Sequence, residues 1–410
     1  MSQLQNPLSC TNPMILAPAC ARRKLAYPTG HRQFAPGPGV AAKGRIWAEI
    51  GVLQLALMKW IFSIISFITL CASEQRGFFS EVEIVPKPYQ RRFLDLEALA
   101  QQNIVLSTKR IILPQFPAAQ NPSILKVDQG YIYTFRVLDY PFVNHIGAVL
   151  LDESFDPISE PQLLDTRLEN RDIESHSEDA TIFTWQNRIY LLYNDNVEVN
   201  RLWWGDRRDM FIVELTFENG EFKLKPATKL IYEQKYFTQH WQKNWGAFIW
   251  KDCLLFRYTI NPHEILYPNL HDGSCYSCYE TKTPIEWEFG ELRGSGAALP
   301  IDGQYLAFFH SGIQVTSQVT PPEEPYWHYF CGAYTFSAEP PFEITCVSPY
   351  PIVDKEFYVS SGLYKRIIFP GGFTLSGPHI YLAYGKDDCE LWIAVIDREA
   401  LMKSLVPVKK

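Results

Sequence analysis

One short pattern occurs five times in this chain and limits its fold more than any other feature. Each copy has a small or polar start, an apolar strand, a tight turn, and an apolar-aromatic strand that ends in a polar group. The clearest copy, EDATIFTWQNRIYLLYND, begins at residue 178, and its strand-like runs 180–185 and 188–193 flank Gln186-Asn187. Two such runs separated by a polar two-residue break predict a β-hairpin.

The other four copies give this pattern its spacing. They begin at 121, 243, 294 and 370 and read NPSILKVDQGYIYTFRV, KNWGAFIWKDCLLFRYTINP, GSGAALPIDGQYLAFFHSG and PGGFTLSGPHIYLAYGKDD. The five starts lie 57, 65, 51 and 76 residues apart, with turns expected at 128–130, 186–187, 251–252, 302–303 and 376–377. Further strand pairs are expected between the hairpins, such as 209–217 with 222–232 and 329–336 with 342–349.

A hairpin followed by a second strand pair makes a four-stranded blade, so five copies predict an all-β chain folded as a five-bladed β-propeller. A flat β-sandwich is the alternative, but a sandwich has no reason to repeat one phrase at these intervals. Residues 392–397 are expected to complete the last blade, and residues 93–102 are expected to form a short helix.

The first ninety residues have a different character. Residues 1–57 are rich in Pro, Gly and Ala and carry scattered Arg and Lys, so we expect a disordered leader or an extension upstream of the true start. Met58-Lys59 precedes the apolar run 60–70, and Cys71-Ala72-Ser73 supplies small residues. That order is typical of a secretory signal peptide if translation starts at Met58.

If translation starts at Met1, the near-continuous apolar run 51–72 is long enough to cross a bilayer as one N-terminal apolar helix. The predicted domains are therefore 1–57 as leader, 58–75 as signal peptide or membrane anchor, and 90–402 as the propeller. We expect a secreted or membrane-anchored protein, or a cytoplasmic one if the apolar run is not a signal.

The composition excludes some classes of function. With 47% hydrophobic residues the chain is a folded one, and its net charge of −7 gives no sign of a nucleic-acid partner. Aromatic residues make up 14% of the chain, which suits a protein that stacks sugar rings, although all-β folds are rich in aromatics in any case.

A propeller would bring polar residues together at one place. The innermost strands of its blades converge on one axis, so the starts of the five hairpins meet at one end of the central channel. Asn121, Asp179, Lys243, Asn244 and Arg293 stand at or beside such starts. The sequence therefore predicts a polar site on the axis.

The same hairpins resemble the motifs of a known family. Glu178-Asp179 resembles a Glu-Asp-Pro-Arg motif whose Asp is a general acid, and Lys243-Asn244 resembles a strand start with a phosphate-binding Lys. The run 294–311 resembles a Gly-rich strand that ends in a phosphate-contacting His, here His310. Residues 384–388, YGKDD, resemble a Tyr-Gly-Ala-Ala-Asp ending with a sugar-contacting Asp, here Asp388. Arg136 and Arg257 resemble the Arg residues near the ends of their hairpins.

Together these motifs resemble glycoside hydrolase family 130, the β-mannoside phosphorylases and β-mannosidases, which fold as five-bladed propellers. The resemblance implies an enzyme that cleaves or phosphorolyses β-mannosides or related oligosaccharides with inversion, or that runs in reverse as a glycosyltransferase. Asp179 would be the general acid, with Asn121, Arg136, Glu178, Asn244 and Asp388 on the substrate and Lys243, Arg257, Arg293 and His310 on phosphate. Inorganic phosphate would be a possible co-substrate, and no cofactor or metal is implied.

Chemistry supports these roles. Glycoside cleavage needs a proton at the leaving oxygen and a nucleophile on the opposite face; water requires a carboxylate base, whereas phosphate requires cations instead. A general acid must be protonated when substrate is bound, so we expect burial or Glu178 to raise the pKa of Asp179 in that state. Nearby cations oppose this, so the sugar has to bind before the acid is ready.

Other interpretations remain open. Ala180-Thr181 replaces the Pro-Arg of the family motif, which puts phosphorolysis in doubt and favours a non-catalytic propeller that binds glycans or proteins. We also expect at least one of Arg136, Arg257 and Arg293 to join neighbouring blades rather than bind phosphate. A metal site is not predicted, because Glu174, His176 and Glu178 alternate along one strand without a second cluster, and the CxxC at 275–278 has no partner pair.

Overall fold

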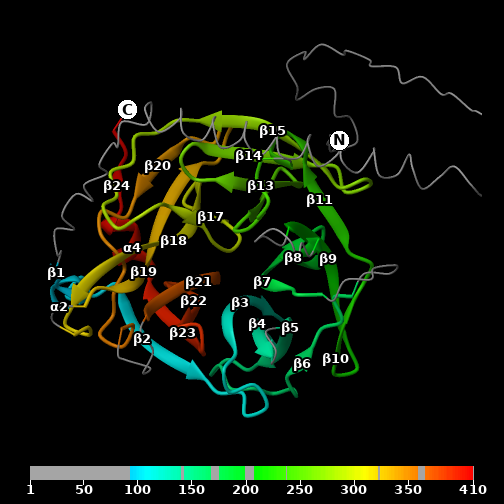
Figure 1. Ribbon diagram of the computed structural model, residues 1–410, viewed down its shortest axis with the longest axis horizontal. Coiled ribbons are helices and arrows are strands. Elements are labelled where there is room, and N and C mark those ends of the chain that lie inside the picture. Colours follow the sequence, from blue (N-terminus) through cyan, green and yellow to red (C-terminus); the bar gives the residue numbers. More distant parts are fainter. Residues whose placement is uncertain are drawn as a thin grey trace, which may run out of the picture. The chain divides into compact units, whose positions relative to one another are not determined.

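The computed structural model describes residues 93–139, 143–167, 175–198, 207–236, 238–321, 324–358 and 365–409. Nearly all their regular structure is β-strand (Figure 1), which confirms the prediction of an all-β fold. The predicted leader, the predicted signal or anchor segment and its apolar helix lie outside the described residues. Within the part that is described, none of the helices is long and apolar enough for a membrane span.

Antiparallel pairing joins the strands into groups that follow the chain. The first group is β3 (Gln120–Val127), β4 (Gly130–Asp139), β5 (Val143–Leu151) and β6 (Gln162–Leu163). The second is β7 (Glu178–Trp185), β8 (Arg188–Glu198) and β9 (Arg207–Glu218), with both β10 (Glu221–Leu224) and β11 (Thr228–Tyr232) paired to β9. The third is β12 (Gly246–Trp250), β13 (Cys253–Thr259), β14 (His263–Pro268) and β15 (Ser274–Thr281).

The remaining strands form two more groups. In one, β18 (Gln304–Ser317) pairs with β16 (Arg293–Gly294), β17 (Leu299–Ile301) and β19 (Tyr326–Ser337), and β20 (Ile344–Val347) pairs with β19 and β24 (Val406–Pro407). The other is β21 (Lys365–Ser376), β22 (His379–Lys386) and β23 (Glu390–Asp397), completed by β2 (Val105–Ile111) from near the other end of the chain. The short elements are β1 (Phe93–Leu94), α2 (Leu96–Ala100), α3 (Glu233–Tyr236) and α4 (Arg398–Ser404).

Parallel contacts link some of these groups, between β11 and β15 and between β19 and β21. Seen down the shortest axis, β3, β7 and β21 lie nearest the middle, while β2, β6, β10 and β15 lie towards the rim (Figure 1). The predicted number of five blades stays a prediction.

The hairpin turns follow the sequence closely. Each expected turn coincides within one residue with a junction between two strands, since Gly130 already belongs to β4 and Ser376 still belongs to β21. At Gln186-Asn187 both residues have positive φ, 48° and 57°, and at Lys251-Asp252 the values are 47° and 65°. Turns of this hand match the right-handed twist of the strands that they connect, so they set the register of each hairpin.

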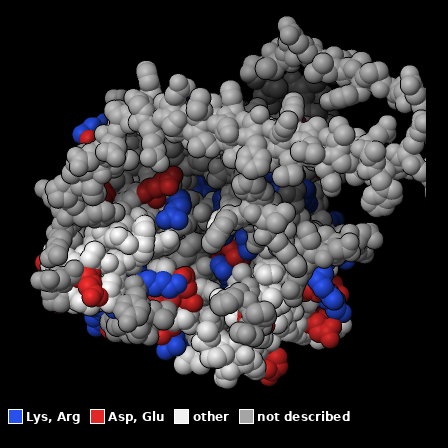
Figure 2. Space-filling model, viewed as in Figure 1, with Lys and Arg blue, Asp and Glu red and all other residues white. Residues whose placement is uncertain are grey.

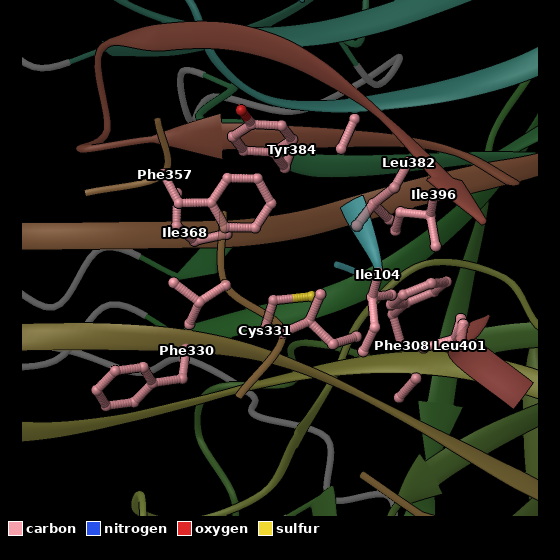
Figure 3. Close-up of a cluster of buried hydrophobic side chains, with 14 of the residues drawn as sticks. Ile104, Phe308, Phe330, Cys331, Phe357, Ile368, Leu382, Tyr384, Ile396 and Leu401 are labelled. Atoms are coloured by element: carbon pink, nitrogen blue, oxygen red, sulfur yellow. The ribbon is translucent and has the colours of Figure 1, made fainter. Parts of the chain in front are cut away.

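The largest apolar cluster lies between the last two groups (Figure 3). Phe308 and Phe330 come from β18 and β19, and Ile368, Leu382 and Ile396 come from β21, β22 and β23. All five are at most 2% exposed, so this cluster fixes the two sheets face to face.

The first strands of neighbouring groups touch one another directly. Ser123 Oγ in β3 accepts a hydrogen bond from Ile182 N in β7 at 3.2 Å. Next to it, Gly371 of β21 lies so close to β3 that a Cβ atom there would be 1.8 Å from the carbonyl oxygen of Pro122. Only glycine permits this approach, and it brings the starts of β3, β7 and β21 to one place.

Candidate active site

The site begins with an unusual backbone conformation at the hairpin starts. Asn121, Asp179 and Asn244 have φ values of 48°, 54° and 63°. Asn and Asp tolerate this left-handed region better than other residues with a Cβ atom. In β3 and β7 the residue lies at a β-bulge, a device that re-aims a side chain. Asn121 Nδ2 then donates to Asp179 Oδ1 at 2.8 Å, so the two starts are joined through their side chains.

Arg136 of β4 connects the two neighbouring carboxylates. Its Nη1 donates to Asp179 Oδ1 and its Nη2 to Glu178 Oε1, both at 3.2 Å. Its Nε donates to Asn144 Oδ1 at 2.8 Å, which fixes the plane of the guanidinium group. Three of the five predicted substrate contacts, Asn121, Arg136 and Glu178, are therefore gathered around the predicted acid.

Glu178 is the centre of the charge network. It is 5% exposed. Its Oε1 accepts from Asn144 Nδ2 at 2.9 Å and lies 2.8 Å from Arg208 Nη2, and its Oε2 accepts from Lys243 Nζ at 2.7 Å. With Arg136, three cations thus hold one buried carboxylate, which compensates for the loss of its hydration.

Arg208 of β9 was missed by the sequence reasoning, as was Asn144. Besides Glu178, Arg208 donates through Nη1 to Asn194 Oδ1 and to the carbonyl oxygen of His176, both at 3.0 Å. The signal that could have found it is the charged run at 207–209 at the start of a predicted core strand, because a buried cation requires a carboxylate nearby.

The cations around Asp179 dominate its pKa in the free protein. Burial raises this pKa, but Arg136 and Lys243, together with hydrogen bonds from Asn121 and Arg136, outweigh burial and lower the pKa below its ordinary value. Asp179 is therefore ionised at neutral pH in the free protein, and the rise in pKa expected when substrate is bound stays a prediction.

His310 and Arg293 lie beside this network. They are backbone partners on β18 and β16. His310 is 3% exposed, and its Nδ1 lies 2.9 Å from Ser295 Oγ. Burial and the charge of Arg293 lower the pKa of His310 to about 3, while Asp179 acts in the opposite direction. His310 is therefore neutral at physiological pH, and Asp179 is close enough to influence its pKa.

Asp388 follows β22 and interacts electrostatically with Arg136 of the network. Its Oδ2 forms an ion pair with Lys365 Nζ of β21, a residue that the sequence did not nominate. Burial lowers the pKa of Arg136, but Asp179, Glu178 and, more weakly, Asp388 raise it, and the net pKa is raised. Asp388 thus lies within electrostatic reach of the same guanidinium group.

Arg257 of β13 has a different environment. It is 2% exposed. Its Nη2 donates to the carbonyl oxygens of Gly296 at 2.6 Å and Ser295 at 3.3 Å, and its Nη1 donates to Tyr334 Oη at 2.7 Å. These bonds join β13 to two segments of the next group, as expected for at least one of the three Arg residues. Phosphate binding by Arg257 stays a prediction, and it would require some of these bonds to break.

Asn244 lies two residues before the first residue of β12 and is half-buried. A Cβ atom on Gly294 would lie 2.4 Å from its carbonyl oxygen, so the starts of β12 and β16 are in close contact. We call the set Asn121, Arg136, Glu178, Asp179, Arg208 and Lys243 the axial cluster. Figure 2 shows cationic and acidic side chains next to one another in the hollowed centre of this face.

The fold of this chain is similar to that of several solved structures. No family model matches the chain, and no curated protein matches it. Similar solved structures include a mannose phosphorylase from Leishmania mexicana in complex with phosphate ion, at 11% identity and TM-score 0.51, covering 77% of this chain and 95% of that one. Another is a glycosyl hydrolase from Bacteroides ovatus, at 13% identity and TM-score 0.50, covering 72% and 91%. The resemblance predicted from the hairpin motifs is thus confirmed at the level of the fold, which this chain shares with glycoside-processing enzymes.

Proposed function

We propose that the chain is a carbohydrate-active enzyme that cleaves β-mannosides or related oligosaccharides with inversion. The observation that carries this proposal is the pair Glu178-Asp179 at a hairpin start: Glu178 is buried, and the half-buried Asp179, with a left-handed backbone, is held by Asn121 and Arg136. A carboxylate fixed in this way, in a fold shared with glycoside-processing enzymes, suits proton delivery to a glycosidic oxygen. We further propose that the ring has five blades and that residues 58–72 direct export or membrane anchoring.

Asp179 has to gain a proton before it can act as the acid. In the free protein it is ionised, because Arg136 and Lys243 lower its pKa. A sugar bound against Asp179 would exclude the remaining water, and its hydroxyl groups would compete for the hydrogen bonds that Arg136 and Asn121 now donate. Both effects raise the pKa of a carboxyl group, so substrate binding itself prepares the acid.

The cations of the site are already paired with Glu178, which favours water over phosphate as the nucleophile. Lys243, Arg136 and Arg208 are paired with Glu178, and the nominated His310 is neutral. Phosphate would have to displace Glu178 from these cations or bind mainly through Arg293. Glu178 and Asp388 are the carboxylates close to the site that could serve as base for an attacking water.

One experiment separates the variants of this function. Purified protein is incubated with β-manno-oligosaccharides with and without inorganic phosphate, and the products are followed by NMR. Hydrolysis releases mannose as the α-anomer first, whereas phosphorolysis releases mannose 1-phosphate. Mannose without any phosphate dependence supports the proposal of hydrolysis, and phosphate-dependent mannose 1-phosphate shows that phosphorolysis is the reaction. Release of mannose first as the β-anomer would contradict inversion.

A non-catalytic propeller that binds glycans or proteins is the second candidate. It is favoured by the lowered pKa of Asp179 and by Ala180-Thr181 in place of Pro-Arg. Calorimetric binding of an oligosaccharide that remains intact after long incubation would support glycan binding over catalysis.

A further inference from the structure

The longest hairpin of the chain carries polar and aromatic side chains from the axial cluster outward. Residues of β18 and β19 stay in register from Gln304↔Ser337 to Val315↔Tyr326. The pairs His310↔Cys331, Gly312↔Tyr329 and Gln314↔Trp327 share one face, because directly opposite residues in a sheet point the same way. Arg293 lies opposite His310 on the neighbouring β16 and belongs to the same face.

These side chains form a continuous aromatic path. The ring of Tyr329 is nearly parallel to that of His310, at 6.1 Å and 16°. The guanidinium carbon of Arg293 lies 5.0 Å from the centre of the Tyr329 ring. The indole ring of Trp327 continues the path at 6.3 Å from Tyr329 and 74° to it. The path therefore runs from a buried imidazole beside the axial cluster to an indole that is 47% exposed.

Gly312 makes room for this path. A Cβ atom at this position would lie 2.7 Å from Cδ1 of Tyr329 and 3.4 Å from Nη2 of Arg293. A side chain on the opposite strand would therefore push Tyr329 away from its place against the sheet. The glycine keeps Tyr329 flat and Arg293 above it.

Trp327, the exposed end of this aromatic path, is also connected to the axial cluster through Lys365 and Asp388. Trp327 is the backbone partner of Lys365 in the parallel pairing of β19 with β21. Lys365 forms the ion pair with Asp388, which acts electrostatically on Arg136. Trp327 thus lies beside Lys365 in the sheet, and Tyr329 contacts both Trp327 and Arg293.

We propose that Trp327, with Lys365 beside it, forms a subsite for a second pyranose ring of the substrate, next to the ring that Asp179 acts on. This inference rests on the proposed function. A half-exposed indole offers a flat apolar face for the C–H groups of a pyranose, and the ammonium group of Lys365 is a donor for its hydroxyl oxygens. The proposed ligand is an oligosaccharide of at least two rings.

The test compares substrates that do and do not reach the subsite. For Trp327→Ala we expect kcat/KM on β-manno-oligosaccharides to fall by about 5- to 10-fold, the range of an aromatic contact. On methyl β-mannoside, whose aglycone carries no second ring, kcat/KM should stay within about twofold. Trp327→Phe should recover most of the loss, because it keeps an aromatic face. Tyr276→Ala, at a 57% exposed position on β15, is the matched control and should leave both substrates unaffected.

Binding separates this proposal from the proposed catalytic function. In an Asp179→Asn background, calorimetry should show weaker binding of a mannotriose by Trp327→Ala and unchanged binding of mannose. Equal losses on the oligosaccharide and on methyl β-mannoside, or no loss on either, overturn the subsite while leaving the enzyme function in place. A wild-type protein that neither binds nor cleaves any β-mannoside overturns both proposals.

Discussion

Arg208 and Glu178 form a buried ion pair, with Arg208 Nη2 at 2.8 Å from Glu178 Oε1 and side-chain exposures of 7% and 6%. The two residues come from β9 and β7, which are not adjacent in their sheet, since β8 lies between them. The pair therefore holds β7 and β9 together across β8 at the site.

We expect Arg208→Met to lower the free energy of unfolding by about 3 kcal/mol, because removing one partner leaves a buried charge less compensated. Urea denaturation followed by circular dichroism measures this difference. Arg188→Met is the matched control, because the Arg188–Glu214 pair is exposed and such pairs contribute about 1 kcal/mol or less. Equal effects in the two variants would contradict a special role for the buried pair.

The second prediction concerns the acid. Asp179→Asn keeps the shape of the side chain but removes the proton, so turnover of β-manno-oligosaccharides should fall by about 10²–10⁴-fold. The loss should be smaller on a dinitrophenyl mannoside, whose leaving group needs little protonation. Asp156→Asn, at an exposed carboxylate, serves as the control. Full activity of Asp179→Asn would show that another residue is the acid.

Glu178 gives a third prediction, because it occupies the cations that phosphate would need. Glu178→Gln removes the negative charge while keeping a hydrogen-bonding side chain of the same size. We expect inorganic phosphate to bind the variant at least about 10-fold more tightly than the wild type, by analogy with other charge-assisted contacts to phosphate. Calorimetry measures this affinity, and Glu214→Gln, whose partner Arg188 is exposed, is the control. Tight phosphate binding by the wild type would mean that Glu178 does not block the anion site.

The fourth prediction concerns stability at acid pH. Burial and nearby Arg residues lower the pKa of His263 and His310 to about 3, and burial lowers that of His328 to about 4. The unfolded chain therefore binds more protons than the folded one below an unfolded-state pKa of about 6.5. The stabilising effect is complete above that pH and is lost as pH falls towards 3.

Urea denaturation between pH 7 and pH 4 tests this sign. The free energy of unfolding should decrease with falling pH, and the decrease should be smaller in His328→Gln, which loses one of the three groups. The lowered pKa of Asp179 adds a further loss that begins only near pH 4 and should be absent in Asp179→Asn. A stability that does not change between pH 7 and pH 4 would contradict neutral buried histidines.

The features that depend on the order of polar and apolar residues could be predicted from the sequence. The turn at Gln186-Asn187 follows from two polar residues between apolar strands, and the contact between Asn121 and Asp179 follows from the convergence of hairpin starts. Arg208 could not be placed in the same way, because its partner lies two strands away in the sheet and thirty residues earlier in the chain.

The pKa of Asp179 shows the same limit. Burial and cations change it in opposite directions, and the sequence names both causes without their distances. The structure decides between them, since Arg136 Nη1 lies 3.2 Å from Asp179 Oδ1. Likewise, only the structure shows that Arg257 donates its hydrogen bonds to two carbonyl oxygens and a tyrosine hydroxyl group.

The pairing of β2 with β23 has a consequence for the order in which the protein is made. Val105 pairs with Ile396 and Ile111 with Leu391, so the sheet whose β22–β23 turn carries Asp388 is completed by strands from the two ends of the described chain. During synthesis β2 leaves the ribosome early and has to wait for almost the whole domain before its partner emerges. Because contacts of such long sequence separation form late, Lys365 and Asp388 should be the last part of the site to assemble, and a nascent chain released before β23 should expose the unpaired edge of β2 to chaperones.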